Sequence, residues 1–148
     1  MDQGNTAFVL FSAAFVLLMT PGLAFFYGGL VKAKSVVSMM MLSFGSLGLV
    51  SVLWVLYGYA ITFADIDDAG WIGIPHLIGI DTNALGLTAQ VAEAAAPVGA
   101  FPELAFVSFQ ATFAIITVAL ISGAVADRAK FGAWMVFAGL WATLVYFP

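Results

Sequence analysis

Residues 104–126 read LAFVSFQATFAIITVALISGAVA, a run that contains no Asp, Glu, Lys, Arg or His. A helix needs about 20 mostly apolar residues to cross the hydrocarbon core of a bilayer, which is about 30 Å thick. Because no water satisfies backbone polar groups at that depth, a continuous apolar run of this length predicts a membrane-spanning helix. This stretch therefore decides the class of the fold, an α-helical membrane protein.

Three other apolar stretches predict further spans, at residues 7–31, 36–64 and 131–148. Their interiors also lack ionisable side chains, and their apolar runs are continuous rather than alternating, which argues against a transmembrane β-barrel. The acidic start MDQGNT is unlike a signal peptide, so the first span is expected to remain in the protein. We expect residues 1–148 to be an all-α, polytopic transmembrane bundle forming part of a single domain, with residues 65–103 as an extracytoplasmic loop.

The overall composition agrees with a membrane protein. Hydrophobic residues make up 64% of the chain and charged residues 8%, whereas a soluble domain has about 45–50% and about 25%. So few charges exclude a soluble enzyme, a nucleic-acid binder and a disordered chain. With no cysteine and one histidine, we expect neither a metal site nor a cofactor.

The basic residues lie in two short connections, Lys32 and Lys34 after the first span and Arg128 and Lys130 after the third. By the positive-inside rule both connections are cytoplasmic, which places the N-terminus outside. Residues 65–103 contain six of the eight acidic residues and no basic one, in agreement with an outer location. We expect a multi-pass protein of the inner or plasma membrane, in contact with the lipid bilayer.

The outer loop contains the single histidine, His76, and the acidic residues Asp65, Asp67 and Asp68. A histidine in such a loop could sense pH, but an ordinary solvated side chain is the preferred interpretation. The three aspartates could attract cations to an outer opening, although solvating charges at a helix end explain them equally simply. No role is therefore assigned to these four residues.

The third span has an apolar stripe on one helix face, at the three- and four-residue spacings of Phe106, Phe109, Phe113, Ile116 and Leu120. In an isolated span this pattern is more typical of packing or lipid contact. Gln110, beside this stripe, favours an inward orientation instead. An amide in hydrocarbon is costly unless it is hydrogen-bonded, so Gln110 is expected to face the bundle interior together with the neighbouring aromatic face. The ring faces of phenylalanines near an outer opening can bind small cations by cation–π attraction. Such a contact contributes about 0.5–2 kcal/mol.

The first span contains two further features. Pro21 removes one backbone hydrogen bond and favours a kink at Thr20-Pro21-Gly22. The following segment, Phe25-Phe26-Tyr27-Gly28-Gly29, combines glycines that allow close helix approach with a tyrosine whose hydroxyl needs a partner in the bundle.

Three segments together resemble the ammonium transporter family (Amt/Mep/Rh): MTPGLAFFYGGLVKAKSVVSMMM (19–41), LVSVLWVLYGYAITF (49–63) and FVSFQATFAIITVALISGAVADRAKFGAW (106–134). The resemblance implies a homotrimer with one pore per subunit, each subunit having about eleven helices arranged as inverted repeats. The chain resembles the N-terminal third of such a subunit. We expect the fragment alone not to conduct.

The resemblance also implies roles for individual residues. Phe109 corresponds to the aromatic residue of an outer recruitment site, with Gln110 beside it, and Phe113 corresponds to one of two phenylalanines that gate the pore. The implied pore lining continues with Phe26, Tyr27, Ile116 and Leu120. The implied substrate is ammonium, with methylammonium as an analogue, and neutral ammonia would pass the apolar constriction.

The resemblance further implies a possible PII-type regulatory partner at the cytoplasmic face. Lys32, Lys34, Arg128 and Lys130 lie on that face, although topology alone is their preferred role. Two alternative functions remain open: a membrane anchor or assembly module that does not transport, and an Rh-like gas channel or ammonium sensor. Neither an enzyme nor a nucleic-acid partner is expected.

Overall fold

The computed structural model describes residues 2–64, 73–74, 78–92 and 97–148. Helix α1 spans Gln3–Leu30 and continues through Pro21 without interruption. Asp2 caps it, its carboxylate accepting a hydrogen bond from the Gly4 backbone N–H at 2.9 Å. A 3₁₀ turn, Ala33–Ser35, then leads into the second long helical segment.

This second segment begins as α2, Val36–Leu53, passes through a π-helical turn, Trp54–Gly58, and ends as α3, Tyr59–Thr62. The third long segment is α5, Glu103–Ile121, which closes with a 3₁₀ turn, Ser122–Val125.

The last segment, α6, Phe131–Trp141, ends in a second π-helical turn, Ala142–Tyr146. Three segments are long and apolar enough to cross a membrane, Gln3–Leu30, Ala33–Thr62 and Glu103–Val125, and Phe131–Tyr146 is apolar but shorter. The all-α membrane bundle predicted from the sequence is confirmed.

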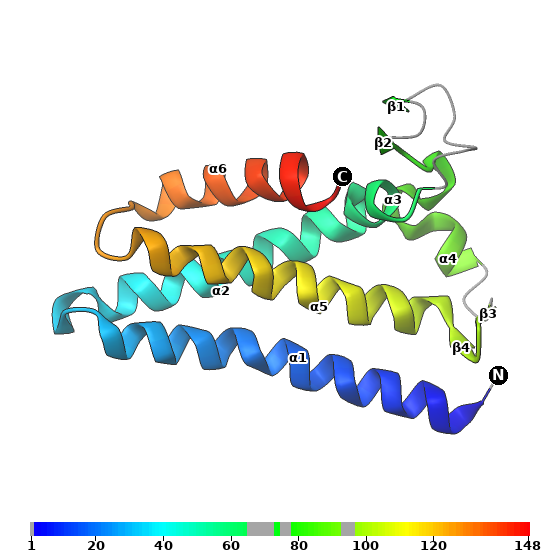
Figure 1. Cartoon of the computed structure of the whole chain (residues 1–148), viewed down its shortest axis with the longest axis horizontal. Coiled ribbons are helices and arrows are strands. Elements are labelled where there is room, and N and C mark those ends of the chain that lie inside the picture. The colour runs from blue at the N-terminus through cyan, green and yellow to red at the C-terminus, as the bar shows by residue number, and fades with distance from the viewer. Residues whose placement is uncertain (1, 65–72, 75–77, 93–96) are drawn as a thin grey trace.

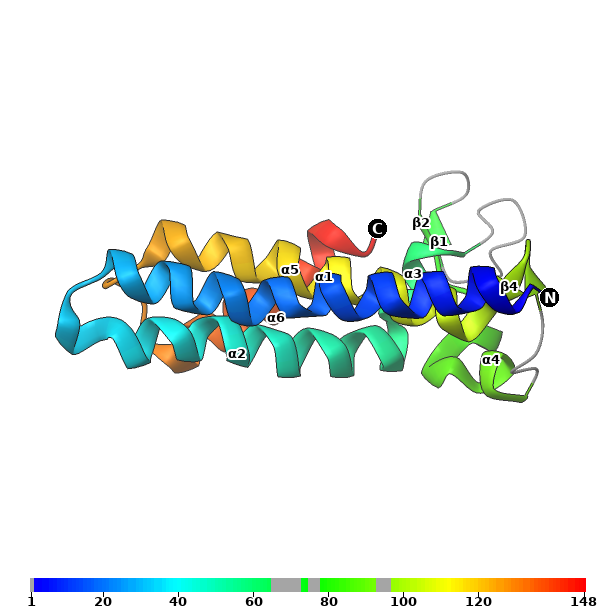
Figure 2. The same ribbon diagram turned by 90° about the horizontal axis from the view of Figure 1, so that it is seen from below.

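The long helices form an elongated bundle in which α1 and α5 run in one direction and α2 and α6 in the other (Figures 1 and 2). Helix α5 packs against both α1 and α2, and α2 also packs against α6. As a result, the α1–α2 and α5–α6 connections lie at the same end of the bundle, and the N-terminus lies at the opposite end (Figure 1). We call the end with the two connections, which carry Lys32, Lys34, Arg128 and Lys130, the basic end. We call the opposite end, which carries Asp2 and Glu103, the acidic end.

Short elements cover the acidic end (Figure 1). Two small antiparallel hairpins pair β1 (Gly73–Ile74) with β2 (Ile78–Gly79) and β3 (Pro97–Val98) with β4 (Phe101–Pro102). Between them lie a 3₁₀ segment, Thr82–Leu87, and the short helix α4, Thr88–Ala92. Part of the segment expected to be a loop is thus regular.

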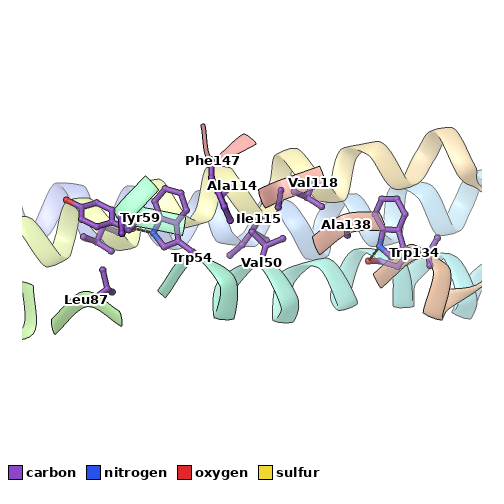
Figure 3. Packing of buried hydrophobic residues seen from close by; sticks show 14 of the residues in the cluster. Val50, Trp54, Tyr59, Leu87, Ala114, Ile115, Val118, Trp134, Ala138 and Phe147 are labelled. Carbon is purple, nitrogen blue, oxygen red and sulfur yellow. Dashed lines mark hydrogen bonds between the residues drawn. The ribbon is translucent and has the colours of Figure 1, made fainter. Parts of the chain in front are cut away.

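The core is held together by two buried tryptophans (Figure 3). The Trp134 indole N–H lies 3.0 Å from both the Leu42 carbonyl oxygen and the Ser46 hydroxyl, which ties α6 to α2. The Trp54 indole donates to the Val107 carbonyl oxygen at 3.3 Å, which ties the second segment to α5. A buried indole N–H needs such a partner because an unpaired polar group is costly in an apolar interior.

Candidate functional site

The phenylalanines of the stripe on α5 make two edge-to-face contacts. Phe106 meets Phe63, with ring centroids 5.1 Å apart. Phe109 meets Phe113 one turn further along, at 5.0 Å and an interplanar angle of 78°. In this geometry the ring edge of one phenylalanine faces the π surface of the other, an arrangement that contributes about 0.5–1.5 kcal/mol beyond burial.

The side chains on and beside this stripe differ in exposure. Phe109 and Gln110 are half-buried, while Phe113 and Leu120 are 37% and 49% exposed. Ile116 is buried. The open part of α5 therefore follows Phe113 and Leu120, and Ile116 belongs to the packed interior of the described bundle.

Tyr27 connects α1 to the far end of this stripe. Its hydroxyl donates to the Leu120 carbonyl oxygen at 3.0 Å, so the tyrosine finds a partner within the bundle. The ring lies directly over Gly123, where an added Cβ atom would come within 2.7 Å of Tyr27 Cζ. The neighbouring Phe26 is 61% exposed and is not part of this contact.

Comparison with known proteins identifies the family of this fold. The sequence profile of the Ammonium Transporter Family matches residues 7–148. The chain belongs to this family. The resemblance inferred from the three sequence segments is confirmed, and it extends over nearly the whole chain.

Individual family members agree with this assignment. The "Ammonium transporter" of Mycobacterium tuberculosis strain H37Rv is 57% identical over 156 residues, covering 99% of this chain and 32% of that protein. The "Ammonium transporter" of Bacillus subtilis is 45% identical over 152 residues, covering 100% of this chain and 34% of that protein. The chain thus spans about a third of the length of these curated relatives.

The crystal structure of Candida albicans Mep2 has the same arrangement of elements. It superposes with a TM-score of 0.81 at 28% sequence identity, covering 100% of this chain and 30% of that one. The bundle is therefore the fold of this transporter family, formed over the corresponding part of a longer chain.

The acidic end of this family member contains a hydrogen-bonded cluster that the sequence did not indicate. The Tyr59 hydroxyl donates to Glu103 Oε1 at 2.7 Å, and the Gln90 amide donates to the same oxygen at 3.3 Å. Glu103 lies in the first turn of α5, where the helix dipole favours a negative charge. The cluster joins α3, α4 and α5 at the start of the helix that carries Phe109.

The two π-helical turns also meet, a second feature absent from the sequence prediction. The Tyr57 hydroxyl lies 2.7 Å from the Thr143 hydroxyl. The Phe147 ring packs so closely on Gly58 that an added Cβ atom would lie 2.8 Å from its Cζ. The only sequence signal for this contact was Gly58 itself, since an isolated glycine in a helix marks close approach.

The four basic residues are all exposed. Lys32 and Lys34 flank the α1–α2 turn, and Arg128 and Lys130 flank the α5–α6 turn, both at the basic end (Figure 1). Within the described residues, no group of His, Asp or Glu side chains could hold a metal ion. His76, Asp65, Asp67 and Asp68 lie outside the described residues.

Proposed function

We propose that this chain is part of a transmembrane transporter that recruits ammonium at the acidic end and passes ammonia along the open face of α5. The observation that carries the proposal is the Phe109–Phe113 contact, half-buried at Phe109 and open at Phe113. The names of the curated relatives supply the substrate class, since they are called ammonium transporters.

The proposed path separates two tasks. An unpaired cation is costly in hydrocarbon, so the aromatic face of Phe109 holds ammonium at the outer opening by cation–π attraction. Gln110 supplies a polar neighbour for the ion. After losing its proton, neutral ammonia passes Phe113 and the apolar surface that Leu120 provides, with Phe26 and Tyr27 near the opposite end.

The proposal includes an orientation and an assembly. The acidic end faces outward and the basic end inward, because exposed lysine and arginine side chains in short connections favour the cytoplasmic side. The N-terminus then lies outside a plasma or inner membrane. We also propose a homotrimer of single-domain subunits, with a PII-type regulator as a candidate partner at the basic end.

The proposal is tested with a full-length protein that contains this chain, expressed in cells that lack their own ammonium uptake. Uptake of labelled methylammonium is measured against concentration for the parent, for Phe109→Ala and for Phe11→Ala. Loss of a cation–π contact should raise the half-saturating concentration about 2- to 30-fold for Phe109→Ala. Phe11→Ala removes the same side chain from the exposed face of α1 and should leave uptake unchanged. Unaltered saturation in Phe109→Ala would refute the recruitment site.

Two other functions make different predictions in the same system. A membrane anchor or assembly module would give no saturable uptake with the parent protein. An Rh-like gas channel or a sensor would fail to concentrate methylammonium in purified vesicles. The regulator is tested separately by charge reversal at Lys32, Lys34, Arg128 and Lys130. Loss of PII binding with intact uptake would indicate that these side chains bind the regulator in addition to setting the membrane topology.

A further inference from the structure

The basic end contains two adjoining cavities that the transport proposal does not use. The first, of about 150 Å³, is lined by Ser35, Ser38 and Asp127 together with Met39, Leu42 and Ala129. The second, of about 560 Å³, is lined by Val37, Met41, Phe131 and Lys130, and it shares Ser38, Leu42 and Ala129 with the first. A polar pocket therefore adjoins an apolar groove where α2 meets the α5–α6 connection and the start of α6.

The two cavities differ in the charged residue that lines them. Asp127 is among the residues that line the small polar pocket, and Lys130 is among those that line the larger groove. Two serines, Ser35 and Ser38, line the same small pocket as Asp127. A ligand that matches this arrangement has a cationic hydrogen-bond donor next to an anionic group, with an apolar chain attached.

A second groove lies further along α2 and α6, beyond the side chain of Phe131. Phe131 and Met135 cross Gly45, where an added Cβ atom would lie 2.8 Å from the Phe131 ring. Beyond this crossing, this second apolar groove of about 420 Å³ follows the same α2–α6 seam and includes Leu49, Leu53 and Leu140. The seam thus extends away from the basic end along the two helices.

We infer that this seam binds a phospholipid with a primary-amine headgroup, of the phosphatidylethanolamine type. The headgroup ammonium lies in the small pocket and donates to Asp127, and the phosphate pairs with Lys130. One acyl chain follows the groove past Val37, Met41 and Phe131, which are 73%, 48% and 44% exposed. Charge complementarity selects this ligand, since a purely anionic headgroup would meet the Asp127 carboxylate.

The test uses a photoactivatable phosphatidylethanolamine with a diazirine in its acyl chain and the full-length protein that contains this chain, in mild detergent. Crosslinks are mapped by peptide mass spectrometry to the segments that contain Met41 and Phe131. Unlabelled phosphatidylethanolamine should compete about tenfold better than phosphatidylcholine, whose quaternary ammonium has no N–H to donate. This competition in the parent protein needs no variant.

Two variants then separate the headgroup contacts. Asp127 has a positive φ of 61°, a conformation that asparagine also tolerates, so Asp127→Asn keeps the turn while removing the charge. It should weaken phosphatidylethanolamine about tenfold and leave competition by phosphatidylglycerol unreduced. Lys130→Gln should weaken both lipids. Asp2→Asn at the acidic end and Lys34→Gln at the basic end are matched controls and should change neither.

Three results would overturn the inference. The first is the absence of crosslinks at Met41 and Phe131 in the parent protein, which would mean that another part of the protein covers the seam. The second is equal competition by the three lipids. The third is an effect of Lys34→Gln as large as that of Lys130→Gln, which would indicate general attraction of lipid to a basic surface.

Discussion

Two phenylalanine pairs with the same spacing lie on two helices of nearly equal hydropathy. Phe11 and Phe15 on α1 are 4.6 Å apart between ring centroids and are 64% and 56% exposed. Phe109 and Phe113 on α5 are 5.0 Å apart, and Phe113 is 37% exposed. The most apolar windows of the two helices have mean hydropathies of 2.1 and 2.2, yet 17% and 44% of their residues are buried. Hydropathy therefore identifies both helices as membrane spans, but it does not specify how much of each helix is buried in the bundle.

The two helices differ in which side chains they bury. Helix α1 buries only small residues, namely Ala13, Thr20, Ala24 and Gly28. This narrow stripe allows close backbone approach on one side and leaves the large phenylalanines on the other. Helix α5 also buries large aliphatic residues, including Ile115, Ile116 and Val118, although each of the two helices packs against the other and against α2. The aromatic pair on α5 therefore lies on a more deeply packed helix than the pair on α1, with Phe109 half-buried and Phe113 37% exposed.

The largest difference should come from two glycines, Gly123 in the 3₁₀ turn that closes α5 and Gly29 on α1. Gly123→Ala would place a methyl group 2.7 Å from the Tyr27 ring, and such overpacking costs about 1–3 kcal/mol. Gly29→Ala on α1 meets nothing within 4 Å and should be neutral or slightly stabilising. Thermal unfolding of the full-length protein in detergent measures both. Equal stability of the two variants would show that the α1–α5 contact is loose.

A second difference concerns how the two helices begin. Helix α1 starts from the exposed Asp2 cap, whereas α5 starts at Glu103, which Tyr59 and Gln90 bind. Tyr59→Phe removes one hydrogen bond to a charged group and should cost about 2 kcal/mol. It should also alter hydrogen exchange at the start of α5. Asp2→Asn retains a capping side chain and should change stability little. Unchanged hydrogen exchange at the start of α5 in Tyr59→Phe would contradict a role of the Tyr59–Glu103 hydrogen bond in holding this end of α5.

The aromatic pairs themselves give the next largest effect. Phe113→Ala removes an edge-to-face contact worth about 0.5–1.5 kcal/mol and should open the proposed gate, which changes selectivity between ammonium and larger amines. Phe15→Ala on α1 removes the corresponding ring and should leave selectivity intact. Competition of amines with methylammonium uptake measures this. Parent-like flux and selectivity in Phe113→Ala would exclude a gating role.

The sequence predicted the features that depend on short-range spacing. The long helices and the shared face of Phe109 and Phe113 follow from helical periodicity. The need of Tyr27 for a partner in the bundle follows from the cost of an unpaired polar group. The sequence did not predict the contact of Phe147 with Gly58 or the binding of Glu103 by Tyr59. These partners are far apart along the chain, and no periodic pattern specifies which distant residue completes a contact. Periodicity also grouped Ile116 with Phe113 and Leu120 on one face, but it did not specify that Ile116 is buried while the other two are exposed.

The smallest effect tests whether the contact between α1 and α5 is a single unit. Tyr27→Phe removes the hydrogen bond to the Leu120 carbonyl oxygen and should cost about 1 kcal/mol, since that oxygen also lies within a helix. The Tyr27 hydroxyl is 2.8 Å from the position of a Cβ atom on Gly123, so removing it relieves part of the clash in Gly123→Ala. The two substitutions together should therefore destabilise the protein less than the sum of their separate effects. Strict additivity would mean that the tyrosine hydroxyl and the glycine act independently, and the contact between Tyr27 and Gly123 would then not be a coupled one.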